Sequence, residues 1–254
     1  LHLENSTLLN HTAYSSTTPK ATSTESGGGA ICVSGHTYLY VDNCNFMDNR
    51  VFAGAGNVAG GAIMFKAGSA FNVTNSVFIN NSASSSYMGT GGAIGEVNVV
   101  DSPEICYITN CTFIENIANG GFSSILAQTV SMVGNLFINS GVTYSFGAAK
   151  TCSYNTFIDC GVGFMHMGWG LVKHNWYGVN PSPRSSDVAA SIINEGGNIY
   201  VKLTTDGGGN NLSNPEYLHS RNVIFKGDVK YDNVDTVNGV AANEITKLLK
   251  EGYV

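Results

Sequence analysis

Short segments of alternating apolar and polar residues recur between Leu1 and Asn180. Four such segments hold a pair of apolar residues two positions apart: Leu39 and Val41, Phe71 and Val73, Cys106 and Ile108, Val130 and Met132. A period of two is that of a β-strand, in which successive side chains point to opposite faces, whereas a helix would space them by three and four. The pattern predicts short strands.

A motif, Asn-x-x-Phe-x-x-Asn, follows these segments and recurs along the chain. Clear copies are Asn43/Phe46/Asn49, Asn75/Phe78/Asn81 and Asn110/Phe113/Asn116, and degenerate copies centre on Leu8, Phe137, Phe157 and Trp176. Three short strands joined by tight turns need about twenty residues, which is one coil of a parallel β-helix. The shortest interval between central positions, from Phe157 to Trp176, is of this length. A propeller or a sandwich is the alternative, but propeller blades are longer and a sandwich has no reason to repeat one signature.

The motif residues have distinct expected places in such a coil. Asparagine suits a corner between strands, because its short amide tolerates the left-handed conformation and can bond to the same amide one coil away. Phenylalanine is expected to stack in the core. The predicted structural ladder comprises Asn43, Phe46, Asn75, Phe78, Asn110, Phe113 and Trp176.

The tetrapeptide Gly-Gly-Ala-Ile occurs at 28–31, 60–63 and 91–94, in phase with the clear motif copies. Paired glycines followed by a small residue suit a turn with positive φ and close backbone packing. The alternation of the two motifs resembles the repeats of polymorphic outer-membrane proteins and of adhesin-like surface proteins of archaea and bacteria. The segment His174 to Pro181 is similar to the Asn-Trp-Trp-Gly-x-Asn-x-Pro segment that commonly closes such helices.

This resemblance covers about residues 1–180 and implies a fold and a location. The fold would be a right-handed parallel β-helix, here residues 1–183 with about seven coils. The location would be extracellular, at the cell surface, with adhesion as the role and no catalytic residue to carry over. Residues 192–254 resemble a bacterial immunoglobulin-like (Ig-like) module that is incomplete at its C-terminus, although residues 244–250 also fit a short helix.

The charge and the distribution of apolar residues exclude some classes of binding partner. The net charge is −6 and only 12% of the residues are charged, so a basic footprint for nucleic acid is absent. No run of 18 apolar residues occurs, so we expect no membrane insertion within this chain. The first residue is Leu1 rather than methionine, and we expect a piece of a longer protein.

The six cysteines raise the question of disulfides. Cys44 and Cys111 occupy the same place in the repeat, but Ser76 holds that place in the coil between them. Two coil steps are about 9.6 Å, beyond the roughly 7 Å between Cα atoms that a disulfide tolerates. We therefore predict buried free thiols, and no Cys-x-x-Cys pair suggests zinc.

An enzyme remains an alternative, because β-helices also host polysaccharide lyases and glycoside hydrolases. Such sites need clustered carboxylates for acid–base chemistry or for calcium. Asp48, Glu115 and Asp159 share one place in the repeat, but Asn80 and Asn139 interrupt that row. We expect no catalytic residue, no metal site and no cofactor.

A contact surface is predicted from where the long coils hold their extra residues. Residues 12–26, 50–59 and 82–90 all follow the motif and precede Gly-Gly, so we expect loops that line up along one edge. Exposed aromatic and apolar side chains among small polar residues are suited to recognition. The candidates are Tyr14, Phe52, Tyr87 and Met88. The expected partner is a glycan or protein on a host or neighbouring cell, and a passive spacer with merely tolerated loops is the other alternative.

Overall fold

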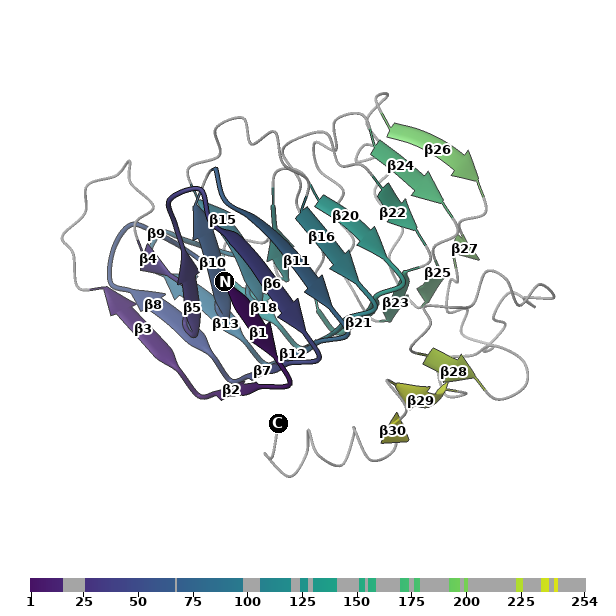
Figure 1. Ribbon diagram of the computed structural model, residues 1–254, viewed down its shortest axis with the longest axis horizontal. Helices are drawn as coiled ribbons and strands as arrows, with labels where there is room; N and C mark the ends of the chain where they lie inside the picture. The colour runs from purple at the N-terminus through teal and green to yellow at the C-terminus, as the bar shows by residue number, and fades with distance from the viewer. Residues whose placement is uncertain are drawn as a thin grey trace.

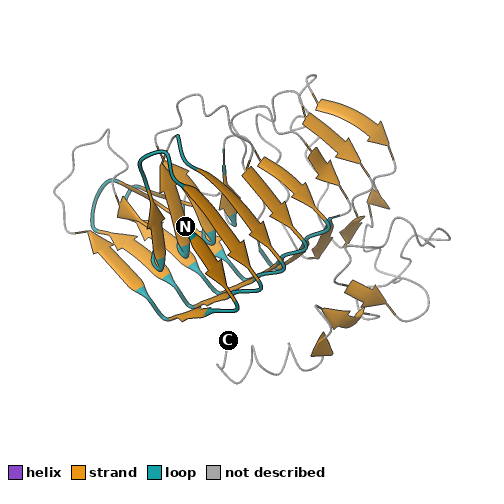
Figure 2. Ribbon diagram, in the orientation of Figure 1, coloured by secondary structure: helices purple, strands orange, loops and turns teal. Residues whose placement is uncertain are grey.

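The computed structural model describes residues 1–15, 26–66, 68–97, 106–119, 124–127, 130–140, 151–153, 155–158, 170–173, 176–178, 192–196, 199–200, 223–225, 234–237 and 240–241. Every regular element among them is a β-strand (Figure 2). Most strands stack in parallel into sheets that follow one long axis (Figure 1). The described part up to residue 200 is therefore an all-β parallel solenoid, and its strands agree with the period of two in the sequence.

Two long sheets run through the stack. Sheet A consists of β1 (His2–Glu4), β6 (Tyr38–Asp42), β11 (Ala70–Thr74), β16 (Cys106–Thr109), β20 (Val130–Val133), β22 (Thr151–Ser153), β24 (Gly170–Lys173) and β26 (Ile192–Gly196). Sheet B consists of β2 (Thr7–Leu9), β7 (Asn45–Met47), β12 (Val77–Ile79), β17 (Thr112–Ile114), β21 (Leu136–Ile138), β23 (Thr156–Ile158), β25 (Trp176–Gly178) and β27 (Ile199–Tyr200). All neighbouring pairs in both sheets are parallel, with one strand from each coil.

Three shorter sheets complete the N-terminal coils. Sheet C holds β3 (Thr12–Ser15), β8 (Arg50–Ala53), β13 (Ser82–Ser85) and β18 (Ile117–Ala118). Sheet D holds β4 (Ser26–Gly27), β9 (Asn57–Ala59) and β14 (Met88–Thr90), and sheet E holds β5 (Ile31–Val33), β10 (Ile63–Lys66), β15 (Ile94–Val97) and β19 (Ile125–Leu126). In the first three coils the chain passes through sheets A, B, C, D and E in that order.

The cross-section of a long coil has two apolar cores. Sheets A, B and E enclose the main core, whose alternating inward residues include Leu39 and Val41 on β6 and Ile63 and Phe65 on β10. Sheets C and D enclose a smaller core, which we call the side lobe, made by Val51, Ala53, Val58 and Ala83. Segments that the sequence predicts as loops, such as 50–59, are thus largely paired strands with a buried face.

Four phenylalanines stack along the main core. Phe46, Phe78, Phe113 and Phe137 are paired in register on neighbouring strands of sheet B. Their ring centroids are 4.7, 4.9 and 4.8 Å apart, and the rings are within 9° of parallel. This spacing follows the distance of about 4.8 Å between strands, so each coil adds one ring to the column.

The first asparagine of the motif occupies an outer corner between sheets A and B. Asn5, Asn43, Asn75 and Asn110 have φ between 49° and 58°, in the left-handed region. Asn43 donates to Asn5 at 2.7 Å and Asn110 donates to Asn75 at 2.6 Å, as predicted for identical amides. Between these pairs, Asn75 donates instead to the Asp42 carboxylate at 2.8 Å.

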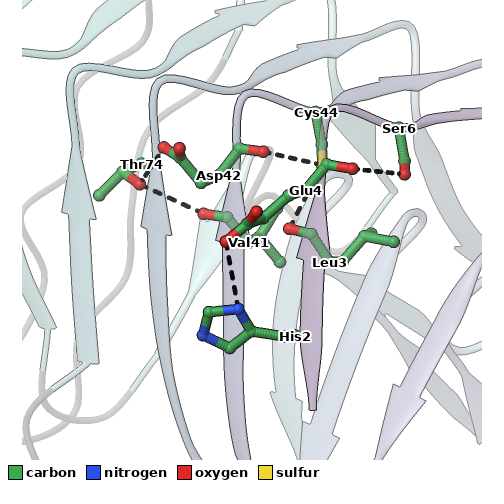
Figure 3. A network of polar contacts seen from close by, with 8 residues as sticks. All are labelled: His2, Leu3, Glu4, Ser6, Val41, Asp42, Cys44 and Thr74. Carbon is green, nitrogen blue, oxygen red and sulfur yellow. Dashed lines mark hydrogen bonds and ion pairs between the residues drawn. The ribbon is translucent and has the colours of Figure 1, made fainter.

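Asp42 also accepts a hydrogen bond from the Thr74 hydroxyl at 2.6 Å, and Figure 3 shows this contact beside the Cys44 thiol. The bonds from Thr74 and Asn75 stabilise the carboxylate and lower its pKa. The Cys44 Sγ donates to the Asp42 carbonyl at 3.1 Å. This corner is therefore closed by polar contacts between neighbouring coils.

The second asparagine of the motif lies inside, at the corner between sheets B and C. Asn49, Asn81 and Asn116 are fully buried. The Asn81 Oδ1 accepts from the Asn49 backbone and side-chain nitrogens, both at 3.0 Å. Its Nδ2 donates to the Phe46 carbonyl at 2.9 Å and to the Asn116 Oδ1 at 2.8 Å. Both ends of this buried amide are thus satisfied by the neighbouring coils.

Gly60 and Gly61 lie between β9 of sheet D and β10 of sheet E, where the two cores adjoin. We call this junction the waist. Gly60 has a φ of +67°, which disfavours any residue with a side chain. A Cβ on Gly61 would lie 2.0 Å from the Gly92 carbonyl oxygen and 2.5 Å from the Ser82 nitrogen. The first glycine therefore supplies the turn, and the second allows the turn to touch the backbone of sheet C.

Two predictions about the C-terminal coils are corrected by strand pairing. Tyr177, not Trp176, pairs with Phe157, while Trp176 pairs with Thr156. The central residue of this coil is therefore Tyr177, and the interval from Phe157 to Tyr177 equals that from Phe137 to Phe157. In addition, β26 and β27 continue the parallel stack, although the sequence places residues 192–200 in the second module.

Beyond residue 200 the described residues form one small antiparallel sheet. It contains β28 (Val223–Phe225), β29 (Val234–Val237) and β30 (Val240–Ala241). An Ig-like sandwich needs more strands than these, so that module stays a prediction. The possible helix at 244–250 lies outside the described residues.

Candidate functional site

The outward face of sheet C carries two of the aromatic residues that the sequence singles out, Tyr14 and Phe52. On β8, Val51 and Ala53 point into the side lobe, so the alternation turns Arg50 and Phe52 outward. Tyr14 on β3 is paired with Phe52 and lies directly beside it. The two rings are stacked, with centroids 5.6 Å apart and an angle of 15° between them.

This stacked pair is open to solvent. Tyr14 is 65% exposed and Phe52 is 45% exposed. Ser84 continues the row on β13, so the aromatic pair is followed by a small polar residue. Two adjacent large apolar side chains on an outer strand face give a contact area that the fold itself does not bury.

Tyr87 and Met88 lie one coil further, at the tip of the side lobe. Tyr87 is 69% exposed in the turn between β13 and β14, and Met88 begins β14 with its side chain half-buried. The Tyr87 backbone nitrogen donates to the Ser85 hydroxyl at 3.1 Å, and the Ser86 hydroxyl donates to the Gly54 carbonyl at 2.5 Å. The structure thus brings Tyr14 and Phe52 into contact. Tyr87 lies on the same lobe, in a turn that these two hydrogen bonds stabilise.

Sheet B offers a less open outward face. Its outward positions are exposed at the N-terminal coil, where Leu9 is 53% exposed, and become buried at Ile79 and Ile114. Leu136 on the next strand is fully buried as well. The middle of this face therefore offers little surface to a partner.

The predicted row of acidic residues is interrupted in space as in the sequence. Asp48 and Glu115 have φ values of 54° and 52° at equivalent corners, with Asn80 between them. The Asn80 amide donates to the Asp48 carboxylate at 2.5 Å. The two carboxylates are thus two coils apart, about 9.6 Å, and Asp159 lies outside the described residues.

The described residues contain no group of three or more His, Cys, Asp or Glu side chains arranged to hold a metal ion. They also include no helix that is long and apolar enough to cross a membrane.

Four cysteine side chains are described, and none of the four is in a disulfide. Cys44, Cys106 and Cys111 are buried, as predicted, whereas Cys32 is exposed, because it points outward from β5. Burial raises the pKa of Cys44, and it raises the pKa of Cys111 to about 12. Cys44 and Cys111 are not bridged to each other, in line with the interrupted place in the repeat. The thiols of Cys152 and Cys160 lie outside the described part of the chain.

No family model matches the chain, and no solved structure matches it. The chain is similar to metabotropic glutamate receptor-like protein R of Dictyostelium discoideum, with 30% identity over 148 residues. The match covers 51% of this chain but only 9% of that protein, so it does not assign a family.

Proposed function

We propose that this chain is the exposed part of a cell-surface or secreted adhesin-like protein. It would act as a non-catalytic scaffold that presents the side lobe to a glycan or protein on a host or neighbouring cell. In this proposal the solenoid coils in a right-handed sense and is followed by an Ig-like module, as in the proteins that its repeats resemble.

The stacked pair of Tyr14 and Phe52 is the observation that carries this proposal. The same strands bury Val51 and Ala53 on their inner face, so the core accounts for the inward residues and not for the outward rings. Tyrosine and phenylalanine supply contact area at a low cost in side-chain entropy. Two adjacent rings on a face that also carries Arg50 suit recognition of another surface.

A polysaccharide-active enzyme is the second candidate. The separation of Asp48 from Glu115 by Asn80 argues against it, because the described carboxylates form no cluster. If the row were catalytic, the Asp48→Asn and Glu115→Gln variants would abolish turnover of polygalacturonate. We expect no turnover by the unmodified chain.

Attachment to cells tests the proposed function. Beads coated with the purified chain should adhere to cells, and the triple variant Tyr14→Ala, Phe52→Ala, Tyr87→Ala should reduce adhesion at least tenfold, as expected for loss of central aromatic contacts. Leu9→Ala removes an exposed apolar residue away from the side lobe and serves as the matched control. Equal adhesion by the triple variant and the control would favour the passive spacer.

A further inference from the structure

A second aromatic surface lies on the outward face of sheet A. Strand pairing places five side chains in one row along the axis, which we call the tyrosine row. They are His2, Tyr40, Asn72, Tyr107 and Ser131. Within β6, the inward neighbours Leu39 and Val41 are buried, so Tyr40 points to the outside.

The tyrosine row is exposed at His2, Tyr40 and Tyr107, whereas Ser131 at its far end is buried. Tyr40 is 42% exposed and Tyr107 is 41% exposed. The Tyr40 ring lies 4.8 Å from the His2 ring and 4.5 Å from that of Tyr38. No hydrogen bond among the described residues involves the Tyr40 or Tyr107 hydroxyl. The fold therefore leaves part of each ring exposed and both hydroxyl groups available, although His2 and Tyr38 pack against the Tyr40 ring.

Strand propensity alone does not explain this arrangement. Tyrosine favours β-strands, so one exposed tyrosine on a strand needs no further reason. Here Tyr40 and Tyr107 share one row, with Tyr38 beside Tyr40 in the row on one side, while the row on the other side holds Asp42, Thr74 and Thr109. A flat strip results, with aromatic rings along one line and hydroxyl and carboxylate groups along the next.

The spacing along the strip points to a polymer with a repeat. Tyr40 and Tyr107 are two coils apart, which is about 9.6 Å. This distance is close to the disaccharide repeat of an extended β-linked glycan, in which pyranose rings present C–H groups on their flat faces. Such faces stack on aromatic rings, and the Asn72 amide lies midway, where it can donate to and accept from sugar hydroxyls.

The negative charge of the strip favours neutral glycans over acidic ones. The outward residues of β1, β6, β11 and β16 include Glu4 and Asp42 and no lysine or arginine. The Asp42 carboxylate is negative at neutral pH, and the hydrogen bonds from Thr74 and Asn75 lower its pKa further. Acidic polysaccharides and nucleic acids would be repelled here, whereas a neutral glycan would not.

We propose that the tyrosine row binds an extended, neutral β-linked glycan that lies along the axis of the solenoid. Alternate sugars would stack on Tyr40 and Tyr107, and the sugar between them would meet Asn72. This surface is separate from the side lobe. The proposal goes beyond the adhesive role assigned to that lobe, and it does not depend on what Tyr14 and Phe52 contact.

Titration calorimetry with the full chain tests this proposal. The protein is made in bacteria, so that the Asn72-Val73-Thr74 sequence stays unglycosylated. Cellohexaose and chitohexaose are the neutral probes and polygalacturonate is the acidic one. We expect binding of at least one neutral hexasaccharide and none of polygalacturonate, with the Tyr40→Ala, Tyr107→Ala variant weakened at least tenfold.

Two further variants separate the row from the rest of the molecule. Tyr40→Phe with Tyr107→Phe keeps the rings and should bind almost as the unmodified chain does. Tyr14→Ala with Phe52→Ala, on the side lobe, should leave glycan affinity unchanged even where it reduces adhesion to cells. Absence of binding to both neutral probes, or an unchanged affinity in a folded Tyr40→Ala, Tyr107→Ala variant, would overturn the proposal.

Discussion

At the scale of single residues, the two asparagines of the repeat have opposite environments. Asn75 lies at an outer corner with a left-handed backbone, and its side-chain amide donates a hydrogen bond to Asp42 at the protein surface. Asn81 is fully buried, and its amide bridges the coils on either side. The first residue is selected mainly by backbone conformation, and the second by the need to satisfy buried polar groups.

Replacement of these two residues should have unequal effects. Asn81→Ala leaves several buried groups without partners, at about 1–3 kcal/mol each, so we expect a loss of about 3 kcal/mol or more in the free energy of unfolding. Asn75→Ala should cost only about 1–2 kcal/mol, because it adds left-handed strain at an exposed corner. Urea denaturation measures both, and similar losses would mean that the inner amide contributes no more than the outer one.

The cysteines allow a second test at this scale. Burial and the raised pKa values of Cys44 and Cys111 predict that neither thiol forms a thiolate near pH 8. Iodoacetamide should therefore modify Cys32 in the native protein and leave Cys44 and Cys111 unmodified until urea is added. Mass spectrometry of the digested protein gives the result, and rapid native labelling of Cys111 would contradict it.

At the scale of elements, the side lobe is the main addition that the structure makes to the sequence prediction. The sequence predicts loops at 50–59 and 82–90, yet these residues form strands of sheets C and D. Strand β13 reads Ser-Ala-Ser-Ser, which has little intrinsic strand preference. It is a strand because β8 beside it offers a complete edge of backbone donors and acceptors, and Ala83 fills the lobe core.

The glycine turn at the waist gives a test for this element. Gly61→Ala would place a methyl group within 2.0 Å of the Gly92 carbonyl oxygen, so the waist must open. We expect a loss of about 3 kcal/mol, at the upper end for overpacked sites. Gly54→Ala is the control, because its new Cβ meets nothing within 4 Å. Thermal unfolding compares the two, and a neutral Gly61→Ala would contradict the close approach.

At the scale of the whole molecule, the solenoid is held together mainly by contacts between neighbouring coils. Phe78 and Phe113, inside the phenylalanine column, each stack on the ring before and the ring after. In such a stack, stability is approximately a sum of coil and interface contributions. Damage to one coil should therefore spread to its immediate neighbours.

Phe78→Ala tests this coupling. Deleting a buried aromatic side chain costs about 3–5 kcal/mol, and here it also interrupts the ring column. We expect faster amide hydrogen exchange in β7 and β17, on either side of β12. Tyr87→Ala, an exposed change in the same coil, should alter the unfolding free energy by about 0.5 kcal/mol or less. Unchanged exchange in β7 and β17 would show that the coils are not coupled through this column.

The position of a residue within its repeat is enough to predict a large part of the fold and part of the candidate surface from the sequence alone. Tyr14 and Phe52 each lie six positions after the centre of their coil, Leu8 and Phe46. Residues at equal offsets become neighbours, because sheets A, B and C are joined by turns of constant length in these coils. Tyr40 and Tyr107 lie six positions before the centres of their coils, Phe46 and Phe113, so the same rule places them in one row. A prediction that considers only the loops misses them.

Where the turns differ in length between coils, the distance of a residue from the coil centre no longer predicts its partner on the next strand. There only the tertiary structure shows which residues pair. The turn between β8 and β9 has three residues, 54–56, whereas that between β13 and β14 has two, 86–87. Met88 therefore pairs with Asn57 although their offsets from Phe78 and Phe46 differ by one. The periodic sequence determined which side chains face the main core, because alternation is local to each strand. Which outer segments became strands, and which rings met, depended on backbone pairing between positions far apart in the chain.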